Sequence, residues 1–191
     1  MTSRDLERVV ADYTERHRAD ARSELAYFAE RPTEEDAVSC AGLAQINGKK
    51  HSHQWRIPPS VLEESRRRLL DNLPLLREAE SFDELHDMIS RVIRPIRGIG
   101  ELAVYDTTLR VGACFGLEPT KVYLHAGTRK GAKALGLDCT RAAIEMPELP
   151  LPLQALTARE AEDVLCIYKD GLGTGRGCHV PKAPRRTRGC C

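Results

Sequence analysis

Residues 93–103 read Ile-Arg-Pro-Ile-Arg-Gly-Ile-Gly-Glu-Leu-Ala, and this stretch lies between two segments with helical periodicity. Gly98 and Gly100 allow a tight turn, because glycine accepts positive φ angles and leaves the backbone uncovered. A helix should begin at or just after Gly100, with its free N–H groups and positive dipole end pointing outward. Ile99 should fill the space between the two helices. The sequence therefore predicts a helical hairpin over about residues 82–115.

A turn of this form can hold a phosphate group, because the backbone N–H groups at a helix N-terminus bind anions without a charged side chain. Nearby arginines add long-range attraction to a polyanion. The alternative is an ordinary helix–helix turn in which the glycines act only as caps. We expect the residues that contact a nucleic-acid backbone here to be Arg94, Arg97, Gly98, Ile99 and Gly100.

Helical signals continue on both sides of the hairpin. Apolar residues recur at helical spacing from Leu6 to Leu25, and Pro32 should end that helix. Thr33 is expected to cap a second helix, and the Ser/Thr-x-x-Glu pattern at Ser60, Ser81 and Thr157 predicts three capping boxes. No run alternates convincingly between apolar and polar residues. We expect an all-α fold, a helical bundle that could divide into two lobes around a cleft.

Composition narrows the class of protein. The chain has 191 residues, of which 30% are charged and 5% aromatic. It lacks a stretch of roughly 20 apolar residues that would span a bilayer and lacks a signal peptide, so we expect a cytoplasmic protein without a membrane partner. Seven cysteines, an odd number at irregular spacing, argue against a disulfide framework.

Charge is distributed unevenly. Residues 1–40 hold six basic and ten acidic residues, whereas residues 91–135 hold eight basic and three acidic ones. Residues 169–191 hold six basic residues and one acidic residue. A polyanion would therefore meet the second half of the chain. We expect one helical domain over residues 1–170 and a basic, flexible tail over residues 171–191.

The hairpin resembles the helix-hairpin-helix motif of DNA glycosylases, whose core reads apolar-x-Gly-apolar-Gly before a helix. In that family a Val-Asp-Thr-His type segment later opens another helix, and here Val122-Tyr123-Leu124-His125 stands in that place. Tyr123 replaces the catalytic aspartate, the lysine of bifunctional members falls near Leu102, and the four-cysteine iron–sulfur spacing is absent. The resemblance covers about residues 80–137.

Whole segments are also similar to prokaryotic antiviral DNA glycosylases: Ile99 to Tyr105, Val122 to Leu137 and Cys166 to Asp170. This resemblance implies a monofunctional enzyme that flips a modified base out of double-stranded DNA. Glucosylated hydroxymethylcytosine of phage DNA is one such base. The same hairpin would serve a non-catalytic DNA-binding adaptor equally well. A nuclease or RNA binder ranks lower, because the sequence shows no clustered carboxylate metal site.

A glycosylase needs a carboxylate that stabilises the oxocarbenium-like sugar or activates water. Asp106 follows the hairpin by one and a half turns and is our first candidate, with partial burial expected to raise its pKa. Its alternatives are solvent exposure or pairing with Arg110. Glu101, at the helix N-terminus, is the second candidate, although an acid there is more often a dipole partner.

Other side chains are candidates for the base pocket or the DNA backbone. Stacking or hydrogen bonding to a flipped base is assigned to Tyr105, Tyr123, His125, Trp55 and His53, with ordinary packing as the alternative. Phosphate contacts are assigned to Arg129, Lys130, Lys133 and Lys169. His51-x-His53 lacks an evident third ligand, so we expect neither a metal nor a cofactor. We expect a monomer.

Overall fold

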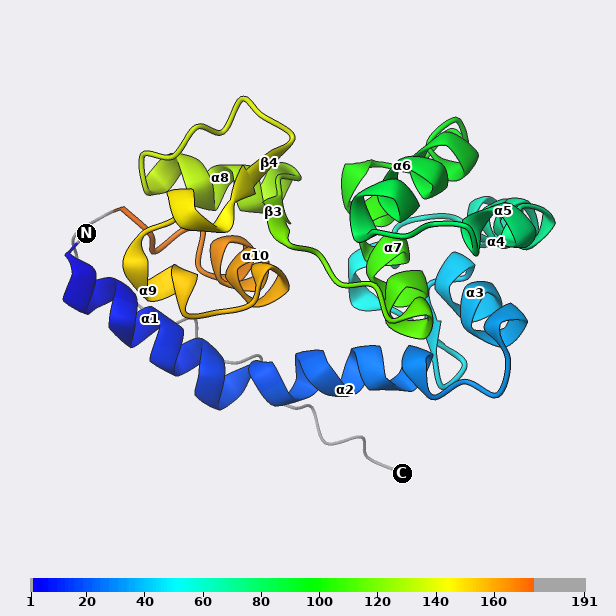
Figure 1. The fold of residues 1–191 in the computed structure, drawn as a ribbon, viewed down its shortest axis with the longest axis horizontal. Helices are drawn as coiled ribbons and strands as arrows, with labels where there is room; N and C mark the ends of the chain where they lie inside the picture. The colour runs from blue at the N-terminus through cyan, green and yellow to red at the C-terminus, as the bar shows by residue number, and fades with distance from the viewer. Residues whose placement is uncertain (1, 174–191) are drawn as a thin grey trace.

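The computed structural model describes residues 2–173, which fold mainly into α-helices (Figure 1). The described residues form ten α-helices, two short 3-10 helices and two antiparallel pairs of very short strands. The helical content confirms the expected class in its coarse form, while the strands were not anticipated. The expected basic tail lies outside the described residues except for residues 171–173. None of the described helices combines the length and apolar character needed to cross a membrane.

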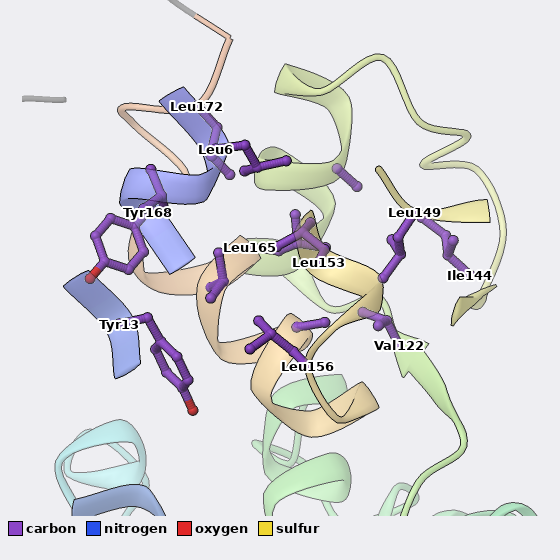
Figure 2. Close-up of a cluster of buried hydrophobic side chains, with 14 of the residues drawn as sticks. Leu6, Tyr13, Val122, Ile144, Leu149, Leu153, Leu156, Leu165, Tyr168 and Leu172 are labelled. Atoms are coloured by element: carbon purple, nitrogen blue, oxygen red, sulfur yellow. The ribbon is translucent and has the colours of Figure 1, made fainter. Parts of the chain in front are cut away.

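One lobe, here called the terminal lobe, combines the first helix with the last third of the described chain (Figure 1). Its elements are α1 (Ser3–Arg16), β3 (Lys121–Tyr123), α8 (Ala126–Ala134), β4 (Ala143–Glu145), the 3-10 helix η2 (Met146–Glu148), α9 (Leu151–Gln154) and α10 (Ala158–Ile167). Their apolar faces meet in one core, where Leu6 and Tyr13 of α1 lie beside Leu165 of α10 (Figure 2). β3 pairs with β4, with Val122 opposite Ile144.

The second lobe, here called the hairpin lobe, holds the middle of the chain. Its elements are α3 (Glu34–Gly42), β1 (Gln45–Ile46), β2 (Lys49–Lys50), the 3-10 helix η1 (Ser52–Gln54), α4 (Pro59–Asp71), α5 (Leu73–Leu76), α6 (Phe82–Ile93) and α7 (Glu101–Phe115). A separate core joins these helices and includes Leu69, Leu85, Ile89 and Ile93. Helix α7 packs against α3 and α6.

Two elements connect the lobes. Helix α2 (Arg18–Ala29) runs from α1 to the hairpin lobe, where Phe28 enters the second core (Figure 1). The segment after α7 returns the chain to the terminal lobe through β3. A small apolar cluster lies where α6, α7 and β3 meet, and it consists of Phe82, Tyr105, Leu109 and Tyr123.

Local capping chemistry sets most helix starts. Thr33, Ser81 and Thr157 each accept a hydrogen bond from the backbone three residues on, as predicted. The predicted capping box is complete at Thr157 but not at Ser81, where the Glu84 carboxylate accepts from the backbone of Glu80 instead. The predicted cap at Ser60 is wrong, because α4 begins at Pro59 with Pro58 as its N-cap, two residues before the start that a Ser60 cap would give, and the fixed φ angle of proline suits the first helical position. The predicted first helix is also interrupted, since His17 separates α1 from α2.

Candidate functional site

The α6–α7 hairpin forms as the sequence predicts. Gly98 has a φ angle of +105°, and α7 begins at Glu101 with Gly100 as its N-cap. Ile96 and Ile99 are buried in the core of the hairpin lobe. Among the described residues no side chain caps Gly100, and a Cβ added there would meet nothing within 4 Å. The first turn of α7 therefore presents open backbone N–H groups at the surface.

Arg94 stabilises this turn from within. Its Nη1 donates a hydrogen bond of 2.8 Å to the carbonyl oxygen of Ile99. The guanidinium group therefore fixes the hairpin and places positive charge beside it. Arg97 is exposed as well, and among the described residues its side chain forms no hydrogen bond to the turn.

A pocket of about 500 Å³ opens next to the hairpin, between the two lobes. One side is formed by α6, Arg94 and the start of α7, and the other by β3, the start of α8 and the segment before β4. The residues that line it include Asp83, His86, Arg94, Glu101, Tyr105, Tyr123, His125, Arg129 and Glu145. Its volume falls within the roughly 300–1,000 Å³ that is typical of small-molecule sites.

Aromatic rings line much of this pocket. The ring centroids of Tyr105 and Tyr123 are 5.6 Å apart, and those of Tyr105 and His125 are 6.0 Å apart. The ring of His86 lies 4.5 Å from that of Tyr123. The Tyr105 hydroxyl is buried without a hydrogen-bond partner among the described residues, and burial raises its pKa well above the usual value. The pocket thus has aromatic walls, while the Tyr105 hydroxyl is closed off from solvent.

Tyr123 and His125 are held in place by hydrogen bonds to side chains of neighbouring elements. Tyr123 donates its hydroxyl proton to Asp83, whose other carboxylate oxygen accepts a 2.5 Å bond from Lys121. His125 Nε2 lies 2.5 Å from a carboxylate oxygen of Glu162. The backbone N–H of His125 donates a hydrogen bond to Oγ1 of Thr128 in the first turn of α8. Both aromatic side chains are therefore oriented by hydrogen bonds to neighbouring elements.

Glu101 is the sequence-predicted carboxylate that reaches this pocket. Its side chain is 58% exposed and lies 3.7 Å from Nη2 of Arg129. Arg129 itself donates 2.8 Å hydrogen bonds to the carbonyl oxygens of Leu124, Cys139 and Arg141. Arg129 therefore braces the wall of the pocket, in addition to carrying charge there.

Asp106 lies on a different face of α7 and does not line the pocket. Its carboxylate accepts a hydrogen bond from Gln54 and lies 3.5 Å from Nδ1 of His53. Burial alone would raise the pKa of Asp106, but the hydrogen bond from His53, the positive charge of Arg110 and the bond from Gln54 hold it below the usual value. The expected rise in its pKa is therefore wrong, because burial comes with polar partners.

Asp106 belongs to a network that joins α2, the loop around η1 and α7. Arg110 is 2% exposed, and its Nη2 donates to both Glu24 and Gln54 at 3.3 Å. Glu24 also lies 3.1 Å from Nε2 of His51. The anticipated pairing of Asp106 with Arg110 is thus indirect, through Gln54.

The remaining predicted residues are dispersed. His53 is half-exposed beside Asp106, and Trp55, next to it in the loop, is 67% exposed. Lys130 and Lys133 are exposed on α8, and Lys130 forms an ion pair with Asp170. Lys169 donates a 2.9 Å hydrogen bond to the carbonyl oxygen of Cys166. The structure brings Tyr105, Tyr123, His125 and Glu101 together and leaves Trp55 and His53 outside their pocket.

Sequence reasoning missed several polar residues of this region. Asp83, His86, Asp87 and Ser90 form a stripe on α6 that faces the pocket. Their spacing of three and four residues is a helical signal that could have been read from the sequence. Glu24 and Gln54 carry no such signal, because they meet α7 only through the tertiary fold.

No protein family model, curated protein or solved structure matches the chain.

Proposed function

We propose that the protein is a DNA glycosylase of the helix-hairpin-helix type. The observation that carries this proposal is the position of the α6–α7 hairpin at the mouth of the aromatic pocket, with Arg94 and Glu101 belonging to both. A strand held at the hairpin would pass the pocket within reach of one extruded nucleotide. Neither feature alone would favour base chemistry over simple binding.

Backbone binding would use the open N–H groups in the first turn of α7, after Gly100. A phosphate at the N-terminus of α7 would be held by backbone donors and the helix dipole, as at other helix N-termini. Arg97 and the exposed lysines Lys130 and Lys133 would add long-range attraction. This part of the proposal needs no base-specific contact.

Base recognition would use the pocket between the lobes. A flipped base has flat faces and polar edges, and enzymes that extrude bases hold them by stacking and by hydrogen bonds to those edges. Tyr105, Tyr123 and His125 offer the rings for stacking. Modified bases, including glucosylated hydroxymethylcytosine, are the substrates to test first, because the pocket is larger than an unmodified base requires.

The chemistry would be hydrolysis of the N-glycosidic bond. The base departs with the bonding electrons and takes a proton from solvent, while water adds to C1′ of the sugar and gives its proton to a carboxylate. We assign this carboxylate to Glu101, because it lines the pocket and is exposed. Asp106 becomes the second candidate, since its carboxylate is engaged by Gln54 and His53.

The test is mass spectrometry of bases released from DNA panels that include hydroxymethylated and glucosylated cytosine. We expect a free base with matching alkali-labile abasic sites, and at least a hundredfold loss of rate in Glu101→Gln. Glu118→Gln, beyond the opposite end of α7, is the matched control and should keep full activity. If Asp106→Asn abolishes release while Glu101→Gln does not, the catalytic role moves to Asp106.

A non-catalytic DNA-binding adaptor is the second candidate function. One observation favours it: the hydroxyl of Tyr123, the residue in the position that matches the catalytic aspartate of the glycosylases that the sequence resembles, is bonded to Asp83. An adaptor would bind DNA firmly and in a salt-sensitive way. Binding of this kind, without release of any base from the whole panel, would reject the glycosylase proposal in favour of the adaptor.

A further inference from the structure

Two histidines and a carboxylate meet beside η1, away from the pocket described above. His51 is the N-cap of this 3-10 helix, His53 is its second residue, and Asp106 reaches them from the middle of α7. One potential ligand atom from each of the three lies within 4.8 Å of the other two. His53 Nδ1 is 3.5 Å from Asp106 Oδ2, and the two imidazole centroids are 4.9 Å apart. The third ligand that the sequence did not reveal is thus supplied by the fold.

The donor types suit a divalent transition-metal ion. Neutral imidazole nitrogens and a carboxylate oxygen are common ligands of Zn²⁺, and sites with three protein ligands leave a position open to water or substrate. His53 is 54% exposed, so the outward side of this cluster faces solvent. A site with one face buried in α7 and one open face fits this arrangement.

The surroundings resemble the outer shell of a metal site. His51 Nε2 lies 3.1 Å from a carboxylate oxygen of Glu24, which leaves the Nδ1 lone pair on the other side of the ring. Histidines that bind metals usually donate their second ring nitrogen to a carboxylate or carbonyl in this way. In this structure the Nδ1 atom accepts only a long 3.3 Å bond from the backbone of His53. Gln54 holds the Asp106 carboxylate and Arg110 holds Glu24, so both acidic groups are fixed in place.

We propose that His51, His53 and Asp106 bind a divalent transition-metal ion of the Zn²⁺ class, with Glu24 as the outer partner of His51. The site lies outside the aromatic pocket and shares Asp106, the second candidate carboxylate, with the proposed glycosylase, but its test measures metal binding alone and does not depend on base release. It replaces the sequence-based expectation that no metal is bound.

The test is titration of the full-length, metal-stripped protein with Co²⁺, followed by absorption spectroscopy and competition with Zn²⁺. A site of nitrogen and oxygen ligands gives ligand-field bands without the thiolate charge-transfer band that cysteine ligands produce. We expect one equivalent to bind in this way. His53→Ala should weaken binding by more than about a hundredfold, because loss of an outer partner alone costs 10–100-fold. Glu24→Gln should show that smaller loss.

The chain offers two other sources of metal ligands, and the design separates them. His125, Glu162 and Cys166 form a second cluster of ligand-type side chains, and Cys178, His179, Cys190 and Cys191 follow in the sequence. Cys166→Ser and a variant with serine at the three later cysteines should leave the Co²⁺ spectrum unchanged. His53 is half-exposed, so its alanine variant should fold, which circular dichroism checks. Absence of Co²⁺ binding, equal affinity in His53→Ala, or a thiolate band that vanishes with the serine variants would each overturn the proposal.

Discussion

Arg94 lies across the hairpin and donates a 2.8 Å hydrogen bond to the carbonyl oxygen of Ile99. Arg97, three residues later, is exposed, and among the described residues its side chain forms no hydrogen bond to the turn. The two arginines therefore offer a matched pair in which one is structural and both carry charge. Their comparison separates attraction of the phosphate backbone from preorganisation of the turn that would bind it.

Arg94→Ala should weaken DNA binding more than Arg97→Ala. Each loses one charge, but only Arg94→Ala also leaves the Ile99 carbonyl without this donor and loosens the turn. In both variants we expect the slope of log K against log salt to fall by about the value for one phosphate contact. Arg94→Ala should also lower the affinity for DNA by about a further tenfold at fixed salt. Fluorescence anisotropy at several salt concentrations measures both quantities. Equal losses would show that the bond to Ile99 contributes nothing to binding.

The two hairpin glycines should differ in what alanine does. Gly98 has a φ angle of +105°, which strains any L side chain, so Gly98→Ala should lower the free energy of unfolding by about 1–3 kcal/mol. Gly100 has a φ angle of −102° and open space at its Cβ position. Gly100→Ala should therefore keep its stability within about 0.5 kcal/mol and weaken only DNA binding, by covering the backbone. Urea unfolding measures the stability of both variants, and fluorescence anisotropy measures their DNA binding. A Gly98→Ala variant as stable as the wild type would contradict the predicted strain at Gly98.

Charge on α8 should contribute to DNA binding without specifying sequence. Lys133 is exposed on the same helix as Lys130, whose charge is partly balanced by Asp170. We expect Lys133→Ala to reduce the magnitude of the slope of log K against log salt by about 0.9, the value for one phosphate. Arg4→Ala, an exposed change on α1, is the control and should leave the slope unaltered. A Lys133→Ala slope equal to that of the wild type would remove α8 from the interface.

Local chemistry made the hairpin predictable from the sequence. The turn at Gly98 and Gly100 depends on the backbone freedom of two residues, and the caps at Thr33, Ser81 and Thr157 depend on contacts three residues apart. The cap at Ser60 was mispredicted because the neighbouring Pro59 starts the helix first. Strands of two or three residues are too short for an alternating pattern, so both sheets escaped notice.

The candidate site was only partly predictable, because its contacts join distant parts of the chain. Tyr105, Tyr123 and His125 were chosen by their position near the hairpin, and the structure brings them to one pocket. Asp106 was chosen by the same reasoning, yet it faces His53 and Gln54 across the hairpin lobe. The face of α7 on which each residue lies decides this outcome, and all faces of that helix are buried, so periodicity alone could not assign them.

Glu162 should make the protein less stable as the pH rises. Burial raises the pKa of its carboxyl group, and the contact with His125 opposes this rise without cancelling it. Because the folded-state pKa lies above the ordinary value of 4.5, the protonated form favours folding. The stabilisation is complete below pH 4.5 and is lost as the pH rises through the folded-state pKa. The glutamine of Glu162→Gln cannot titrate. The free energy of unfolding of this variant should therefore rise relative to that of the wild type as the pH increases above 4.5.

Glu148→Gln provides a control of opposite sign. Glu148 is exposed, and its hydrogen bond with Arg141 lowers the pKa of its carboxyl group. Any stabilisation from this group is therefore present at neutral pH and lost as the pH falls through the folded-state pKa, and solvent screening should keep it small. Urea unfolding of the three proteins between pH 4 and pH 8 compares the slopes. The opposite result would be a Glu162→Gln variant whose free energy of unfolding falls relative to that of the wild type as the pH rises. In that case the Glu162 carboxylate of the wild type is ionised in the folded state, and its bond with His125 outweighs the cost of burial.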